Sequence, residues 1–166
     1  MTDAEEWRPV AGYEGIYEVS SRGRVRSLPR VDSRGRRNRG RYLAVINHPS
    51  GHKQVKLSRE GTSKPGKLHR IVLIAFMGPP PPGCEVLHGD GDPGNNALSN
   101  LRWGTRSENL RDAVRHGTHY WAIKTHCPQR HPYDDENTYR ASDGRRMCRE
   151  CLRIRNREAR AKKKAS

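Results

Sequence analysis

The segment 85–117 constrains the fold of this chain more than any other part of the sequence. An apolar run ends in a histidine at His88, a loop of Asp, Gly and Asn residues follows, and a second short apolar run comes after the loop. Thr105 precedes Glu108 by three residues, which is the capping-box pattern that starts a helix. We therefore predict two short strands joined by a turn-rich loop, and then a helix that begins at Arg106.

The predicted helix has an apolar face and carries one residue that bears on chemistry. Leu110, Ala113 and Val114 recur at helical spacing and are expected to be buried, and a glycine ends the helix. Asn109 falls in the first turn. From there we expect its side chain to face His88.

Upstream of this segment the sequence predicts a small β module. Tyr17 and Val19 alternate as in a strand, a turn at 21–23 follows, and Val25 opens another strand. Residues 29–41 are rich in Arg, Gly and Ser, so we expect them to form a mobile basic loop.

Two more strands and one more helix are predicted between the β module and the segment 85–117. The strands lie at 42–46 and 54–57 and are joined by a turn. Residues 67–77 have apolar side chains spaced as on one face of a helix. Gly78 and the four prolines after it end this helix and form a stiff connector.

The charge of the chain indicates a polyanionic partner. The formal net charge is +15, and residues 22–70 hold fifteen Lys or Arg against two acidic residues. Residues 71–126 are balanced, with five of each sign, and the tail from Cys127 onward holds twelve basic and six acidic residues. The electrostatic field of such an excess of positive charge attracts nucleic acid. A ribosomal-type protein, or one that is merely charged for solubility, is the alternative.

The sequence gives no sign of a membrane or secreted protein. No apolar run approaches the about 18 residues that a membrane span needs, and the N-terminus lacks the pattern of a signal peptide. We therefore expect a cytoplasmic protein in which the four cysteines are thiols or metal ligands rather than disulfides. Cys84 has no partner in the sequence and is expected to be an ordinary buried residue.

The segment from Glu85 to Asn109 resembles the HNH endonucleases with a ββα-metal site, in particular the phage and intron-encoded homing type. The resemblance rests on the order and spacing of these residues: His88, Asp90, Asn95, Asn96, Asn100, Trp103 and Asn109. Residues 5–28, with Trp7, Tyr13 and Tyr17, resemble the small N-terminal module that accompanies many of these enzymes and helps to position DNA. Without the resemblance these aromatic residues indicate only a small hairpin with buried rings.

The resemblance assigns roles to four residues. Hydrolysis of a phosphodiester with one divalent metal needs a general base beside the attacking water and an oxygen ligand across a small gap. By resemblance, His88 is the base, Asn109 is a ligand of Mg²⁺ or Mn²⁺, and Asn100 holds the loop and orients the histidine. His69 matches a further family histidine and joins the candidate catalytic set, with packing or phosphate contact as its expected role.

The sequence departs from the family at Leu87. The family usually has Asp or Asn there as a second metal ligand, and leucine cannot coordinate a metal. The metal would then rest on Asn109, phosphate oxygens and water, or recruit Asp90. A degenerate enzyme is the alternative that follows from this missing ligand. Taken singly, a lone histidine at a strand end and an Asn-rich loop are usually only surface and turn residues.

The expected substrate is double-stranded DNA, cut to leave a 5′ phosphate and a 3′ hydroxyl. The basic segments should hold backbone phosphates, with solvated surface charge as the alternative for each residue. The candidate DNA contacts are Arg22, Arg24, Arg26, Arg70, Arg102, Arg106 and Arg111.

The tail carries four candidate zinc ligands in two close pairs. They are Cys127 and His131, and then Cys148 and Cys151. Tetrahedral structural zinc is bound by such a set, and the tail resembles zinc-binding tails of some actinobacterial and phage HNH proteins. Free cysteines or a redox-active pair are the alternatives. A hairpin is expected between the pairs, and a basic helix that fades into a disordered end is expected after them.

Together these features predict an α+β protein with a ββα-metal nuclease core, a small N-terminal β module and a zinc-stapled C-terminal tail. The expected segments are a DNA-binding β module (1–30), a basic loop and β-hairpin (31–66), the HNH nuclease core (67–118), a linker (119–126) and a zinc-binding basic tail (127–166).

The expected function is that of a metal-dependent DNA endonuclease of the phage homing type, acting in the cytoplasm of a bacterial host as a monomer or weak dimer. The main alternative is a DNA-binding regulatory or packaging accessory protein on a degenerate HNH scaffold. An RNA-binding protein would explain the charge but not the pattern of histidine and asparagine.

Overall fold

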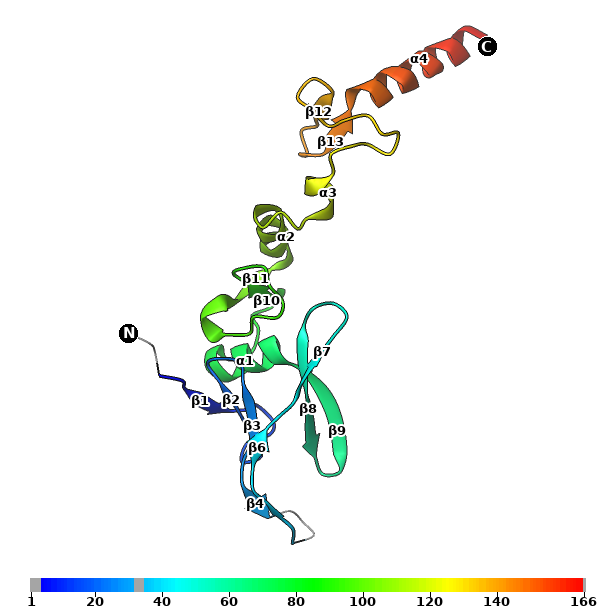
Figure 1. Cartoon of the computed structure of the whole chain (residues 1–166). Helices are drawn as coiled ribbons and strands as arrows, with labels where there is room; N and C mark the ends of the chain where they lie inside the picture. Colours follow the sequence, from blue (N-terminus) through cyan, green and yellow to red (C-terminus); the bar gives the residue numbers. More distant parts are fainter. Residues whose placement is uncertain (1–3, 32–34, 166) are drawn as a thin grey trace. The chain divides into compact units, whose positions relative to one another are not determined.

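The computed structural model describes residues 4–31 and 35–165 (Figure 1). The chain divides into two compact units, of which the first runs to His116 and the second begins at Gly117. Each unit has its own secondary structure and is described by itself. Among the described residues, no helix is long and apolar enough to cross a membrane.

The N-terminal module is a four-stranded antiparallel sheet. Its order is β1-β2-β3-β6, formed by β1 (Trp7–Pro9), β2 (Tyr17–Ser20), β3 (Val25–Ser27) and β6 (Arg41–Tyr42). Tyr17, Val19 and Val25 are buried, as their alternation in the sequence predicts. The strands predicted around these residues are confirmed.

The prediction of a mobile loop over 29–41 is wrong for much of that segment. A hairpin of β4 (Arg30–Val31) and β5 (Arg37–Asn38) occupies it, and β6 begins at its end. Residues 32–34, also part of the prediction, lie outside the described residues. These strands are at most half-buried and are held by backbone pairing, so their sequence carries no apolar alternation.

A three-stranded antiparallel sheet follows, in the order β7-β8-β9. It consists of β7 (Val45–Asn47), β8 (Lys53–Arg59) and β9 (Thr62–Lys67). The single strand predicted over 42–46 is divided between β6 and β7, which belong to different sheets. The sequence predicted β8 but not β9. That strand is mostly exposed and contains a proline and a glycine, which usually count against a strand.

Helix α1 (Leu68–Met77) lies at the centre of the first unit. Leu68, Val72 and Leu73 are buried in one apolar cluster with residues of both sheets and with Leu101. The helix contacts strands of both sheets and the hairpin that follows it. Its predicted extent is confirmed to within one residue, and Gly78 ends it by donating its N–H to the Ile74 carbonyl.

The segment 85–117 forms the two strands and the helix that were predicted for it. Strand β10 (Cys84–His88) pairs antiparallel with β11 (Leu101–Thr105), a 3₁₀ turn (Leu98–Asn100) lies before β11, and α2 (Arg106–Arg115) follows directly. Thr105 and Glu108 form the capping box at the start of α2.

The predicted buried face of α2 is wrong. Leu110 and Val114 are 47% and 52% exposed, whereas Asp112 is only 5% exposed. Asp112 accepts a 2.6 Å hydrogen bond from Arg102 on β11 and also pairs with Arg115. An ion pair rather than the apolar residues therefore sets the side of α2 that meets the hairpin.

The turn of the N-terminal module abuts the loop between β10 and β11. The Leu98 N–H donates to the Ser21 carbonyl at 2.8 Å. Gly23 has φ +75°, and a Cβ there would lie 2.7 Å from the Asn96 carbonyl oxygen. Glycine is needed at this position for both reasons, and the loop after His88 is thereby fixed from outside the hairpin.

The second unit is built around a short hairpin and a long basic helix. It contains α3 (Tyr120–Ile123), β12 (Thr138–Arg140), β13 (Arg146–Cys148) and α4 (Arg149–Ala165). The hairpin predicted between the ligand pairs is confirmed. The segment expected to be a linker contains α3, and α4 runs through the end expected to be disordered.

Candidate active site and metal centres

His88 is the last residue of β10 and belongs to a cluster of three histidines. Its ring centroid lies 5.3 Å from that of His69 on α1 and 5.7 Å from that of His52, and the rings of His52 and His69 are 4.6 Å apart. His69 is buried and the other two are half-buried. The structure thus brings together two histidines that the sequence predicted, His69 and His88, and one that it missed.

Burial keeps the clustered histidines neutral. Desolvation, together with the neighbouring His52, lowers the pKa of His88 below its ordinary value of 6.5. Desolvation also lowers the pKa of His69, to about 3. Among the described residues, nothing hydrogen-bonds the buried Nε2 of His88. A neutral ring with a free nitrogen is the form in which histidine accepts a proton.

Asn100 holds the loop that follows His88. Its side-chain amide donates to the Asp90 carboxylate at 2.9 Å and to the Asn95 carbonyl at 3.0 Å, while its Oδ1 accepts from the Asp90 N–H at 3.0 Å. Its own carbonyl accepts from the Gly89 N–H at 2.8 Å. These bonds tie the residues directly after His88 to the start of β11.

Asp90 is already engaged as an acceptor in this loop. Its carboxylate accepts hydrogen bonds from the Asn95 amide at 2.7 Å, the Asn100 amide at 2.9 Å and the Asp92 N–H at 2.9 Å. The bond from Asn95 contributes most to a pKa lowered to about 2. Binding a metal through Asp90 would cost some of these bonds.

Asn109 makes its hydrogen bond to Glu85 and not to His88. The Asn109 Nδ2 donates to the Glu85 Oε1 at 2.8 Å, across the gap between α2 and β10. Because side chains alternate along a strand, Glu85 and Leu87 share one face of β10 and His88 projects from the other. Glu85 thus puts a carboxylate beside Asn109, two residues before the position at which the family has its ligand.

Leu87 itself is buried and packs against the hairpin. It is 1% exposed and lies against Gly104 on β11, where an added side chain would clash with it. The sequence offered one signal for Glu85: its spacing of two from Leu87, which puts the two side chains on the same face. His52 lies in the turn before β8 and carried no such signal.

The arginines predicted to contact DNA fall into two groups. Arg24, Arg26 and Arg102 form ion pairs with Glu5, Glu18 and Asp112 respectively. Arg70, Arg106 and Arg111 are exposed on the first unit. Arg22 is also exposed and has an interaction of its own.

The four predicted zinc ligands converge in the second unit. The Nδ1 of His131 lies 3.6 Å from the Sγ of Cys127, 3.6 Å from that of Cys148 and 3.3 Å from that of Cys151, and the sulfurs of Cys127 and Cys151 are 3.7 Å apart. With metal–ligand bonds of about 2.1–2.3 Å, a tetrahedral ion has edges of roughly 3.3–3.8 Å. The donor set therefore fits a closed tetrahedral ion.

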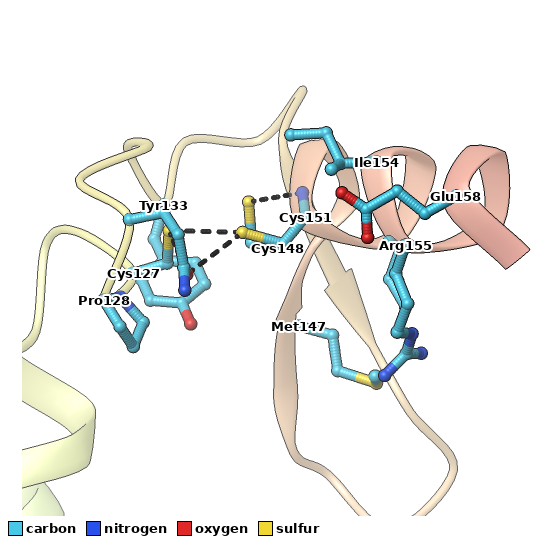
Figure 2. Close-up of a pocket in the computed structure, with 11 residues that line it drawn as sticks. Cys127, Pro128, Tyr133, Met147, Cys148, Cys151, Ile154, Arg155 and Glu158 are labelled. Carbon is cyan, nitrogen blue, oxygen red and sulfur yellow. Dashed lines mark hydrogen bonds between the residues drawn. The ribbon is translucent and has the colours of Figure 1, made fainter.

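Neighbouring groups support these ligands. Asn137 donates its side-chain N–H to the Cys148 sulfur at 3.3 Å, and the Cys151 backbone N–H donates to the same sulfur at 3.4 Å. The three cysteines lie beside the start of α4, along a cavity of about 410 Å³ that Met147 and Ile154 also line (Figure 2). Cys84 is elsewhere and half-buried, so its predicted burial is only partial.

Two segments of the chain match known protein families. Residues 67–111 match the HNH endonuclease family and residues 5–58 match the NUMOD4 motif. DNA endonuclease I-HmuI of Bacillus phage SP01 is 34% identical over 113 residues, which cover 68% of this chain and 60% of that protein. An uncharacterized HNH endonuclease of Acanthamoeba polyphaga mimivirus is 31% identical over 115 residues, or 67% of this chain and 26% of the relative.

A solved structure is also similar to this chain. The structure described as DNA binding and cleavage by the HNH homing endonuclease I-HmuI matches with a TM-score of 0.57 at 34% identity, over 68% of this chain and 60% of that one. The chain therefore spans less than two thirds of the length of each of these relatives. It carries an HNH endonuclease domain preceded by a NUMOD4 motif and is a homologue of the phage homing endonuclease I-HmuI.

Proposed function

We propose that this protein is a metal-dependent DNA endonuclease that hydrolyses phosphodiester bonds to a 5′ phosphate and a 3′ hydroxyl. The observation that carries the proposal is the state of His88, a neutral ring with an unpartnered nitrogen at the end of the HNH hairpin. That nitrogen accepts the proton of the attacking water. Asn100 acts as a positioning residue, since it fixes the loop into which the strand of His88 runs.

The metal-binding oxygens in this proposal come from Glu85 and Asn109. Asn109 donates through its amide nitrogen to Glu85, which leaves the Asn109 carbonyl oxygen and one Glu85 oxygen as ligands. Mg²⁺ or Mn²⁺ accepts such a sparse set because it keeps several waters. When bound, the ion supplies charge stabilisation for the phosphate and the leaving oxygen. Glu85 thus takes the part of the ligand that the chain lacks at Leu87.

Double-stranded DNA is the proposed substrate, because the similar solved structure is one of DNA binding and cleavage by I-HmuI. The exposed Arg70, Arg106 and Arg111 lie on the same unit as His88 and are the proposed phosphate contacts. Residues 1–30 are proposed to help position the DNA. We further propose that the protein is a phage-borne homing enzyme. It would act in the bacterial cytoplasm as a monomer or weak dimer.

One observation favours a second function. Leu87 fills the position of a metal ligand and is almost fully buried. A scaffold with a lost ligand could serve as a DNA-binding regulatory or packaging accessory protein. The presence of His88, Asn100 and Asn109, together with the pairing of Glu85 with Asn109, supports the enzyme over this alternative.

We propose that the tail binds a structural zinc ion through Cys127, His131, Cys148 and Cys151. The support is the tetrahedral spacing of their ligand atoms. With all four positions taken by protein, such an ion contributes to folding rather than to catalysis.

His88→Ala should abolish nicking of supercoiled plasmid while DNA affinity stays nearly unchanged. Loss of a general base typically costs about 10²–10⁴-fold in rate, whereas binding depends on dispersed phosphate contacts. His48→Ala is the matched control, since His48 is exposed and its ring hydrogen-bonds the Ser50 hydroxyl in the turn before β8. Nicking by His88→Ala at close to the wild-type rate would refute the assignment of the base.

Glu85→Gln should raise the concentration of Mn²⁺ needed to half-saturate the protein–DNA complex, measured by electron paramagnetic resonance on uncleavable DNA. The cause is the loss of a charged oxygen ligand. Glu60→Gln is the control, because the Glu60 side chain is 81% exposed. Leu87→Asn restores an oxygen ligand at the family position. It should therefore lower the concentration of Mn²⁺ needed for half-saturation. Identical curves for Glu85→Gln and the wild type would exclude Glu85 as a ligand.

Cys148→Ser should release zinc from the purified protein and lower the helix signal of the tail, because three remaining ligands hold the ion poorly. Cys84→Ser should retain it, since Cys84 lies outside the cluster. Zinc per chain, measured by elemental analysis after dialysis against a weak chelator, reports the result. Equal zinc in the two variants would contradict the proposed ligand set.

A further inference from the structure

Three histidines from separate parts of the first unit point at a common space. His52 comes from the turn between β7 and β8, His69 from the first turn of α1, and His88 from the end of β10. One ring nitrogen from each lies within 4.8 Å of the other two. Fifteen or more residues separate each histidine from the next in the sequence, so only the tertiary fold unites them.

The ring nitrogens in this cluster lack hydrogen-bond partners. Among the described residues, none satisfies the Nδ1 of His52, the Nδ1 of His69 or the Nε2 of His88, although each of these atoms is buried. His69 is only 7% exposed. Buried polar atoms are nearly always paired, so an unpaired set that converges needs an explanation. A bound ion would satisfy all three nitrogens at once.

We propose that His52, His69 and His88 form a binding site for a transition-metal ion of the zinc class, separate from the oxygen site at Glu85 and Asn109. Imidazole nitrogen suits Zn²⁺, Co²⁺, Ni²⁺ and Cu²⁺, whereas Mg²⁺ prefers oxygen. Bonds of about 2.0–2.1 Å require nitrogens roughly 3.3 Å apart. The rings therefore close by up to about 1.5 Å on binding. The fourth position is left for water or phosphate.

The site also has a consequence for catalysis, and this part rests on the proposed function. The nitrogen of His88 that accepts the water's proton would be occupied by the ion. Zinc-class ions would then inhibit cleavage supported by Mg²⁺, by blocking the base rather than by displacing Mg²⁺. The binding site itself requires no nuclease activity, so the two claims are tested separately.

The binding test uses the full chain with the tail loaded with zinc and loosely held metal removed by dialysis. Titration with Co²⁺ should fill about one further site per chain, with ligand-field bands but no thiolate-to-cobalt charge-transfer band, since the ligands are nitrogen. His52→Gln should weaken this binding by about tenfold or more through loss of a ligand. His48→Ala, in the same turn, should bind as the wild type does.

Two outcomes would overturn the site. One is the absence of further Co²⁺ binding by the wild type, and the other is equal affinity in the wild type and His52→Gln. Circular dichroism of each variant guards against misfolding, and His88→Ala provides a second variant that should also lose the ion.

The cleavage test measures plasmid nicking in Mg²⁺ with increasing Zn²⁺, each variant relative to its own zinc-free rate. His52→Gln should need about tenfold or more Zn²⁺ for half-inhibition, in proportion to its weaker binding. If the three histidines bind cobalt but cleavage is not inhibited, the metal site stands and His88 is excluded as the base. Absence of cleavage under any condition would overturn the proposed function and leave the cobalt result to decide the site.

Discussion

The burial of α1 between the two sheets and the hairpin is the interaction on which the rest of the first unit depends. Leu68, Val72 and Leu73 join strands of both sheets and Leu101 in one cluster. Because His69 lies three and four residues before the buried Val72 and Leu73, on the same face of the helix, the same burial places His69 in the interior, against His88 and His52. Packing of apolar side chains thereby removes water from three imidazoles and keeps them neutral.

The hairpin of β10 and β11 carries a histidine on one face and a carboxylate on the other. His88 projects toward α1 and the histidine cluster, whereas Glu85 projects toward α2 and Asn109. The His88 imidazole and the oxygen groups of Glu85 and Asn109 thus lie on opposite faces of the hairpin, and nitrogen and oxygen donors suit different metal ions.

The sequence predicted best where local signals decide the structure. The capping box at Thr105, the alternation around Val19 and the ligand pairs of the tail each act over a few residues, and the structure has the expected elements. Strand β9 and the hairpin at residues 30–38 were missed because their side chains are mostly exposed, so the sequence carries no apolar alternation there. The buried face of α2 was predicted wrongly, since the ion pair of Asp112 with Arg102 depends on a strand elsewhere. His52 was missed for the same reason, as only the tertiary fold brings it to His69 and His88.

The central claim is that burial holds the histidine base neutral and unpartnered, and the most direct measurement is a site-specific titration by NMR. The imidazole signals of metal-free protein, assigned with single His→Gln variants, would be followed against pH. The account predicts that His88 titrates below the ordinary value of 6.5 and that His69 titrates lower still, at about 3. Titration of either ring at or above 6.5 would contradict it, because a solvated or charge-paired histidine is not the base described here.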